Sequence, residues 1–428
     1  MRKEIANIHS SVQRKAVTYQ SEYIDTLNRL LGENEHLGEL KFFLDTAYLW
    51  SNEKEKNHHK PEAVILGTGI PEELVIAAGA QPYWLTGGSF GSLAWSDDIV
   101  PRDTDPVSRS ILGYICQPCG ADFSDSLFIV PLSSDAMRKI AFELKVQGRS
   151  IVTIDIPPQR DDKNAKVIWQ RQMQSMMRAV SQRTGVRVTR RAVLSAAQRV
   201  SRSRKALKDF LDVSRGRSDI ITDSARLFIA GSYYLTGNID SWTFRLQALT
   251  QRIYHLRMQM PFARNDRPRV LLMGSPVVFP NYKIPFLIRE TGLEVLDFAD
   301  QTAVKNSLIC GTDMFIGSKA RLIKTISSVS YMNDASPAFV NNLSLYRYVS
   351  ALVQRGDIEG VVYHVLKGQI EYDFELERLE KLFSAYGIPV FRLETDYQYQ
   401  DVEQLRIRLE AFSEMLVHNR CREVKKAL

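Results

Sequence analysis

Three cysteines have residue types and spacing that could support metal or redox chemistry. Cys116-Gln117-Pro118-Cys119 is a CxxC pair, a spacing that can bind zinc, hold one edge of an iron–sulfur cluster or exchange thiol for disulfide. The sequence contains no second CxxC, so Cys310 is the remaining candidate for a third ligand. The four cysteines are too few for a disulfide framework in a chain of 428 residues. The alternative to a metal site is a pair of reduced thiols in a loop.

Polar residues also follow two predicted strands near the end of the chain. Gly360–Leu366 is a short apolar run rich in β-branched residues, and Ile388–Leu393 is a second one. The charged segment between them has helical apolar spacing, so the three form a βαβ unit. Ligands of open parallel sheets bind beyond the carboxyl ends of the strands. His364 near the end of the first strand, Gln369 beyond it and Asp396 after the second are therefore site candidates. His364 is either a general base or a hydrogen-bonded structural residue.

The first half of the chain has a similar alternation of strands and helices. The predicted strands are Val64–Leu66, Pro82–Leu85, Leu127–Leu132 and Ile151–Ile156. Gly67-Thr68-Gly69 then resembles the start of a dinucleotide-binding loop, but Glu72 stands where a third glycine would be. A backbone anion site at the start of the helix that follows Pro71 is the alternative.

These patterns divide the chain into four parts. Residues 1–60 are predicted to be a helical N-terminal segment, and residues 61–160 a first α/β domain. Residues 161–265 are predicted to be helical and basic, and residues 266–428 a second α/β domain with a C-terminal helix. The two α/β domains are predicted to be a loose duplication of one strand–helix architecture.

Charge and hydropathy limit the classes of partner. The net charge of +7 is modest for this length and favours acidic partners or phosphorylated ligands. Basic residues gather in the helical region, but aromatic residues for stacking are scarce among them, so we expect a solvated helix face in preference to a nucleic-acid surface, with a phosphate contact as a third alternative. We expect no membrane segment and a cytoplasmic location, because no apolar run reaches membrane-spanning length. The basic residues in question are Arg190, Arg191, Arg199, Arg202, Arg204, Lys205 and Lys208.

Several longer segments resemble one known family. The sequence is similar to the 2-hydroxyacyl-CoA dehydratase and benzoyl-CoA reductase subunits, also called the 2-hydroxyglutaryl-CoA dehydratase D-component family, over nearly the whole chain after about residue 45. The segments that carry the resemblance are Pro71-Glu72-Glu73-Leu74-Val75 with Ala77-Ala78-Gly79-Ala80-Gln81-Pro82, then Arg269-Val270-Leu271-Leu272-Met273-Gly274-Ser275-Pro276, then Gly387-Ile388-Pro389 with Leu393-Glu394-Thr395-Asp396-Tyr397, and finally Gln404-Leu405 with Arg408, Ala411, Phe412 and Glu414.

The resemblance implies a fold and a chemistry. The fold would be two Rossmann-like parallel-sheet domains with a helical N-terminal segment and a helical middle region. Active members hold a [4Fe–4S] cluster between the domains, pair with a paralogous subunit and receive an electron from an ATP-dependent activator protein. A hydroxyacyl thioester radical then loses its hydroxyl group as water. Glu73 matches an acidic residue that lies near the substrate in these enzymes; the alternative is a first-turn carboxylate that stabilises its helix.

The chain departs from the family where the cluster cysteines are expected. Asp105, Ser134, a position near Thr302, and Gln369 replace them, and Asp135 follows Ser134. Iron–sulfur clusters need thiolates, and oxygen and amide groups bind soft iron–sulfide cores poorly. We therefore expect a pocket formed by these five residues without a cofactor.

Two functional hypotheses follow from the resemblance. In the first, the chain is a cluster-less subunit or a member that binds an acyl-CoA-like ligand. In the second, it is an active subunit of a dehydratase or benzoyl-CoA reductase-type complex. Its [4Fe–4S] cluster would then be held by Cys116, Cys119 and Cys310, or by the partner subunit.

Overall fold

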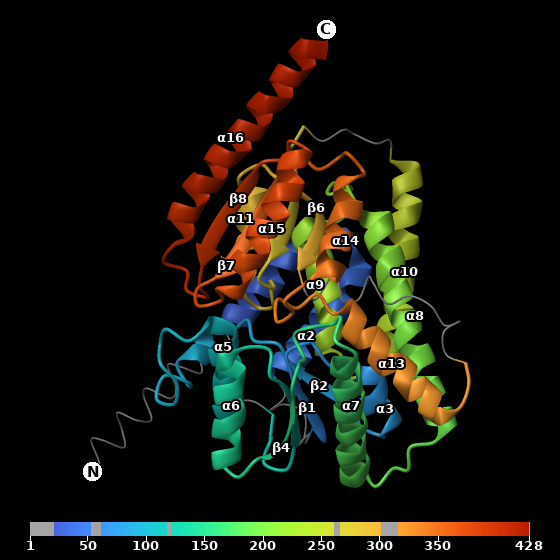
Figure 1. Ribbon diagram of the computed structural model, residues 1–428. Helices are drawn as coiled ribbons and strands as arrows, with labels where there is room; N and C mark the ends of the chain where they lie inside the picture. Colours follow the sequence, from blue (N-terminus) through green and yellow to red (C-terminus); the bar gives the residue numbers. More distant parts are fainter. Residues whose placement is uncertain (1–20, 53–60, 118–120, 261–265, 301–315, 428) are drawn as a thin grey trace.

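The chain forms two separate four-stranded parallel sheets, one in each half (Figure 1). A computed structural model describes residues 21–52, 61–117, 121–260, 266–300 and 316–427. The strand orders are β2-β1-β3-β4 and β6-β5-β7-β8, which is the same order counted from the start of each sheet. The predicted α/β fold with two parallel-sheet units is confirmed. The strands are β1 (Ala63–Leu66), β2 (Pro82–Leu85), β3 (Leu127–Pro131), β4 (Ser150–Ile154), β5 (Arg269–Gly274), β6 (Glu294–Asp300), β7 (Gly360–Leu366) and β8 (Val390–Thr395).

The central strands are largely apolar because helices cover both faces of each sheet. All residues of β1 and β7 are buried, as the uninterrupted apolar runs predict. Four helices follow the first three strands of the first sheet. They are α3 (Glu72–Ala77), α4 (Phe90–Leu93), α5 (Pro106–Cys116) and α6 (Asp135–Val146). Before them come a helix over residues 21–32, the short 3₁₀ helix η1 (Gly38–Leu40) and α2 (Lys41–Ser51).

A layer of long helices joins the two halves. α8 (Arg190–Ser214) packs against α10 (Ile239–Gln259) and α3, and it buries the apolar face that the spacing predicts. α13 (Lys319–Asn333) comes from the second half of the chain but packs on α7 (Lys163–Thr184) and α8. The layer is completed by α9 (Asp223–Ser232) and η3 (Tyr233–Leu235).

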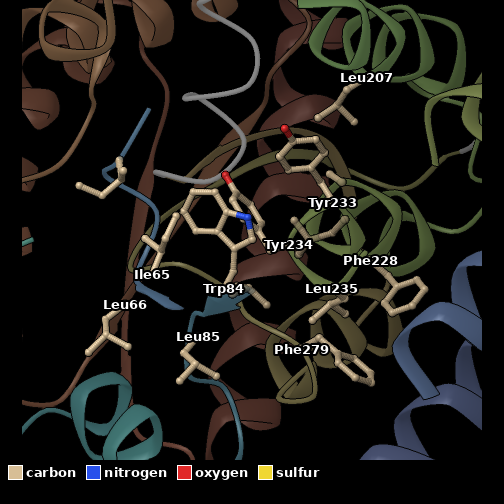
Figure 2. Close-up of a cluster of buried hydrophobic side chains, with 14 of the residues drawn as sticks. Ile65, Leu66, Trp84, Leu85, Leu207, Phe228, Tyr233, Tyr234, Leu235 and Phe279 are labelled. Carbon is tan, nitrogen blue, oxygen red and sulfur yellow. The ribbon is translucent and has the colours of Figure 1, made fainter. Parts of the chain in front are cut away.

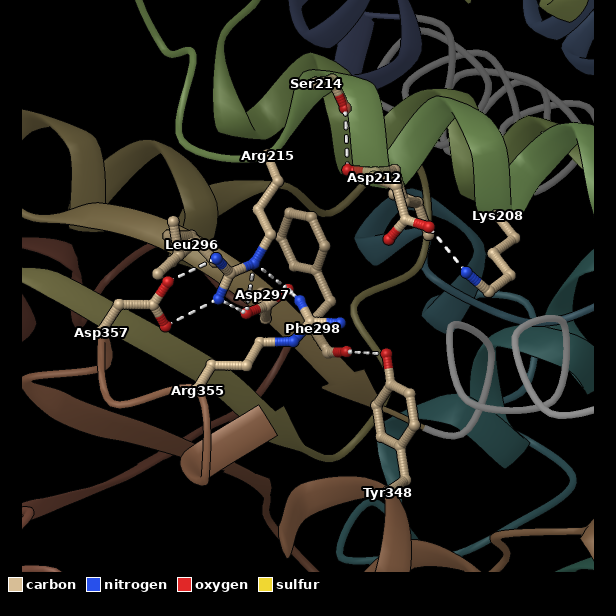
Figure 3. Close-up of polar contacts among 12 residues, drawn as sticks. Lys208, Asp212, Ser214, Arg215, Leu296, Asp297, Phe298, Tyr348, Arg355 and Asp357 are labelled. Carbon is tan, nitrogen blue, oxygen red and sulfur yellow. Dashed lines mark hydrogen bonds and ion pairs between the residues drawn. The ribbon is translucent and has the colours of Figure 1, made fainter. Parts of the chain in front are cut away.

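Two arginines of this layer have positions that we did not predict from the sequence. Arg204, counted among the basic residues of α8, is only 2% exposed. Arg215, just after α8, makes paired hydrogen bonds to Asp297 on β6 and to Asp357, with distances of 2.5–3.0 Å (Figure 3). This guanidinium therefore fixes the end of α8 to the edge of the second sheet.

The second sheet is covered by α11 (Lys283–Glu290), α14 (Leu343–Val353), α15 (Glu371–Ala385) and α16 (Val402–Ala427). α16 extends past the body of the molecule to the C-terminus (Figure 1). A common apolar core links the first sheet to the helical layer. Trp84 on β2 packs edge-to-face on Tyr234, with ring centroids 5.2 Å apart, beside Leu235 and Phe279 (Figure 2). Among the described helices, none combines the length and hydrophobicity needed to cross a bilayer.

Candidate functional site

A cavity of about 100 Å³ lies between the carboxyl ends of the two sheets. Its walls come from loops that follow strands of both halves: Gly67–Gly69 after β1, Ser133 and Ser134 after β3, Pro276 after β5 and Gln369 after β7. Parallel sheets deliver the ends of their strands to one edge, so residues far apart in the sequence meet there. The cavity is therefore where this fold places a ligand.

Asp105 and Gln369 lie together in this cavity wall. Asp105 is the N-cap of α5 and accepts a hydrogen bond from the Ser108 N–H at 3.0 Å. Its Oδ1 also accepts from Gln369 Nε2 at 3.4 Å. The Asp-Pro pair explains the local structure, because Asp is a favoured cap and proline suits the first helical position.

A chain of hydrogen bonds fixes the orientation of the Gln369 amide. The Leu366 N–H donates to Ser275 Oγ at 3.0 Å, and the Ser275 hydroxyl then donates to Gln369 Oε1 at 2.7 Å. With its oxygen engaged in this way, the amide nitrogen is left to face Asp105. Both polar ends of the side chain are thus held by the protein.

The remaining predicted pocket residues have different positions. Ser134 lines the cavity and is the N-cap of α6, where it accepts from the Met137 N–H at 3.3 Å. Asp135 is fully exposed, 3.8 Å from Arg138, and lines a groove outside the cavity. Thr302 lies outside the described residues. The structure thus brings Asp105, Ser134 and Gln369 into one cavity and places Asp135 at its mouth.

That outer groove has a volume of about 790 Å³ and adjoins the cavity through shared wall residues. Two large apolar side chains in it are unusually exposed, Phe142 at 65% and Ile370 at 66%. Arg138 and Lys139 of α6 also lie along it. The groove therefore combines an apolar surface with two cations and with five carboxylates, those of Asp103, Asp105, Asp135, Glu143 and Glu371.

Glu371 is a site residue that the sequence reasoning missed. It is in the first turn of α15 and lines both the cavity and the groove. Burial raises the pKa of its carboxyl group, and the charges of Asp105 and Asp135 raise it further. The sequence could have indicated this residue, because it lies two positions after Gln369 at the same strand-to-helix junction.

The described lining of the cavity does not fit an iron–sulfur cluster. It contains carboxylate, hydroxyl and amide groups, and no cysteine occurs among its described residues. Asp105, Ser134 and Gln369 already bond to protein groups, and such hard donors are poor ligands for iron–sulfide cores.

The predicted cysteine site lies elsewhere in the molecule. Cys116 ends the helix that Asp105 begins, so it is roughly 16 Å along the helix axis from the cavity. Its thiol is half-buried, and burial raises its pKa. Cys119 and Cys310 lie outside the described residues. In the described ranges, no group of three or more His, Cys, Asp and Glu side chains is arranged to hold a metal.

Glu73 faces away from the cavity, toward the helical layer. Its carboxylate is 2.9 Å from Arg204 Nη1, while Glu72 is 2.7 Å from Arg204 Nη2 and accepts from the Tyr233 hydroxyl at 3.0 Å. All of these side chains are buried. This geometry favours the structural alternative for Glu73, a first-turn carboxylate held in an ion pair.

His364 is also buried and does not line the cavity. Its Nδ1 lies 3.2 Å from the Ser275 carbonyl oxygen, and the Ser275 N–H donates to the His364 carbonyl at 2.7 Å. Burial lowers the pKa of His364 to about 4, so the ring is neutral and donates from Nδ1. Its contacts hold Ser275, which in turn orients Gln369. The geometry favours the structural alternative for this residue.

Comparison with known proteins gives one family and several relatives. The family described as 2-hydroxyglutaryl-CoA dehydratase, D-component, matches residues 68–416. A protein of Escherichia coli (strain K12) named as a dehydratase subunit, YjiM, is 23% identical over 82% of this chain and 90% of its own length. The (R)-phenyllactyl-CoA dehydratase beta subunit of Clostridium sporogenes and the lactoyl-CoA dehydratase subunit beta of Anaerotignum propionicum are each 21% identical, over 81% of this chain and 89% of their own lengths.

Proposed function

Because the chain belongs to the 2-hydroxyglutaryl-CoA dehydratase D-component family, we propose that it is a subunit of a dehydratase-type complex that binds an acyl-CoA-like ligand and holds no iron–sulfur cluster in its inter-sheet cavity. The observation that carries this proposal is the cavity itself. It has the position expected for a ligand of parallel sheets, and its described polar groups suit an organic ligand better than a metal–sulfide core.

The groove outside the cavity supports a thioester with a long carrier. Phe142 and Ile370 offer apolar surface for the pantetheine chain, and Arg138 and Lys139 offer cations for its phosphates. The acyl group would then enter the cavity, where Gln369 and the hydroxyl groups of the wall can bind a carbonyl or hydroxyl oxygen. The protein's contribution would be to position this group and to shield it from water.

A partner subunit is the second part of the proposal. The relatives from Clostridium sporogenes and Anaerotignum propionicum are named as beta subunits of dehydratases. We propose that this chain likewise pairs with a second subunit, and that an ATP-dependent activator serves the complex. Any electron-carrying centre would then belong to the partner.

Anaerobic purification followed by assays of iron and acid-labile sulfide tests the cofactor proposal. We expect far less than one cluster per chain and no broad absorbance in the visible range. Stoichiometric iron that is lost in Cys116→Ser would contradict the proposal and favour a cluster on the cysteine set. Cys421→Ser, which changes an exposed thiol at the far end of α16, is the matched control.

Calorimetric titration with lactoyl-CoA tests the ligand proposal. We expect saturable binding that is weakened in Gln369→Ala and in Phe142→Asp, because one change removes a polar contact in the cavity and the other places a charge in the groove. Absence of binding by the chain, alone and together with its partner subunit, would overturn this part.

A further inference from the structure

In the part of the chain that the structure describes, the side chains of the cavity wall include two carboxylates and no cation. Asp105 and Glu371 both line it, and the described residues around it include no lysine, arginine or histidine. The other polar side chains are one amide, Gln369, and a set of hydroxyl groups. The hydroxyl groups belong to Thr68, Thr86, Ser108, Ser133, Ser134 and Ser336, with the hydroxyl of Tyr372 as a further aromatic member.

The helix N-termini at the cavity do not offset the negative charge of its wall. Helix N-termini normally attract anions, because their free N–H groups and dipoles point outward. Here α5, α6 and α15 all begin at this edge, but each has a carboxylate of its own there. Asp105 caps α5, Asp135 is in the first turn of α6, and Glu371 is in the first turn of α15. The positive end of each helix dipole therefore already has a carboxylate of the protein beside it, and an incoming anion would gain little there.

Among the described residues, positive charge lines the groove and not the cavity. Arg138 and Lys139 line the groove but not the cavity, and Arg138 is itself shared between Asp135 and Asp155. In the described lining, the groove thus has two cations among five carboxylates, and the cavity has two carboxylates without a cation. Burial is the main cause of the raised pKa of Glu371, and the neighbouring carboxylates of Asp105 and Asp135 raise it further, which is consistent with this field.

We infer that the inter-sheet cavity selects a polar group that is uncharged or cationic and rejects one that bears a carboxylate. Resting on the proposed function, this identifies the ligand class as a thioester whose acyl part carries hydroxyl or carbonyl groups without a second carboxylate. Asp105 and Glu371 are the specificity-determining residues. A dicarboxylic acyl group such as 2-hydroxyglutaryl would place its free carboxylate against them.

A thiol introduced in the wall measures the sign of this field without any thioester. Ser133 lines both cavity and groove and is half-buried, so Ser133→Cys gives a reporter that reagents can reach. The rates of its modification by cationic 2-aminoethyl and anionic 2-sulfonatoethyl methanethiosulfonate are read by peptide mass spectrometry. The native exposed Cys421 in the same sample is the internal reference. Taking the ratio of the two rates cancels any change in thiol reactivity that affects both reagents alike.

We expect the cation-to-anion rate ratio at the introduced thiol to exceed that at Cys421 by roughly ten-fold at low salt, and to fall as salt screens the charges. Adding Asp105→Asn and Glu371→Gln should bring the ratio close to that of Cys421. A ratio at or below that of Cys421, or one that the two neutral substitutions leave unchanged, would overturn the inference.

Titration with two thioesters separates this inference from the proposed function. We expect lactoyl-CoA to bind about ten-fold more tightly than 2-hydroxyglutaryl-CoA, and the neutral double variant to lose most of this preference. Binding of neither thioester contradicts the proposed function, while the thiol ratio still decides the sign of the field. Equal or tighter binding of 2-hydroxyglutaryl-CoA to the unmodified chain overturns the selectivity and leaves thioester binding intact.

Discussion

Gln369 Nε2 donates to Asp105 Oδ1 over 3.4 Å, joining two residues that are 264 positions apart in the chain. One residue caps the first helix turn of α5 in the first half, and the other follows the last residue of β7 in the second half. The contact crosses the seam between the two sheets, where a ligand of this fold would lie. This pair therefore connects the two halves of the chain and also lines the cavity between them.

Asp105→Ala should lower the free energy of unfolding by about 1–2 kcal/mol, because it removes the N-cap of α5 and the contact with Gln369. Asp105→Asn is the matched control, since asparagine caps helices about as well as aspartate and can still accept from Gln369. Urea unfolding curves measure both variants. An equal loss in the two would mean that the charge, and not the cap, stabilises this site.

Gly88→Ala should disrupt the seam. Gly88 has φ +100°, and a methyl group added there would lie 2.5 Å from the carbonyl oxygen of Phe279 in the opposite half. We expect a loss of several kcal/mol, since backbone strain and a collision with backbone act together. Gly67→Ala is the control, because Gly67 has φ +78° but nothing within 4 Å of the added methyl. Thermal unfolding of both variants separates the two effects, because Gly67→Ala has backbone strain alone and Gly88→Ala has strain and a steric clash. A similar loss of stability in the two would argue against close packing of the two halves at Gly88.

Arg204→Ala should destabilise the protein by about 3–5 kcal/mol, because it leaves Glu72 and Glu73 buried without their cation. Arg202→Ala, two residues earlier on an exposed face of α8, should change the free energy of unfolding by less than about 0.5 kcal/mol. Denaturant titrations measure both variants. A small effect at position 204 would show that the two glutamates find other partners.

His364 should make folding sensitive to acid. Its pKa in the folded chain is about 4, whereas an unfolded histidine has a pKa near 6.5, so between these values only the unfolded state takes up the proton. The free energy of unfolding should therefore fall as the pH drops from about 6.5 to about 4, by about 3 kcal/mol at most from this residue. His364→Asn keeps a donor for the Ser275 carbonyl and cannot titrate, so its stability should depend less on pH over that range. Parallel slopes for the two proteins would rule out His364 as the source.

Much of the architecture was accessible from the sequence because it depends on local patterns. The uninterrupted apolar runs of β1 and β7 predicted buried parallel strands, and the Asp-Pro pair at 105–106 lies where a helix begins. The repeated strand–helix alternation predicted two related sheets, and they share one strand order. The family resemblance is borne out by the match over residues 68–416.

The individual roles of charged residues were harder to predict. Arg204 lies four residues after Val200 and three before Leu207, on the apolar face of α8, but nothing within the helix shows what partner allows a guanidinium to be buried there. Its burial depends on Glu72 and Glu73, which are more than a hundred positions away. Likewise, Glu73 and His364 have residue types suited to catalysis, but their neighbours in space give each a structural partner.

The sequence by itself determined which segments form strands and helices and how the two halves repeat. Those properties depend on residue type and on spacing over a few residues. Only the tertiary structure decided which polar side chains share a cavity and which face the helical layer, and it added Glu371 to the cavity wall. The physical reason is that the site forms where strand ends of two separate sheets meet, and the packing of distant segments fixes that meeting.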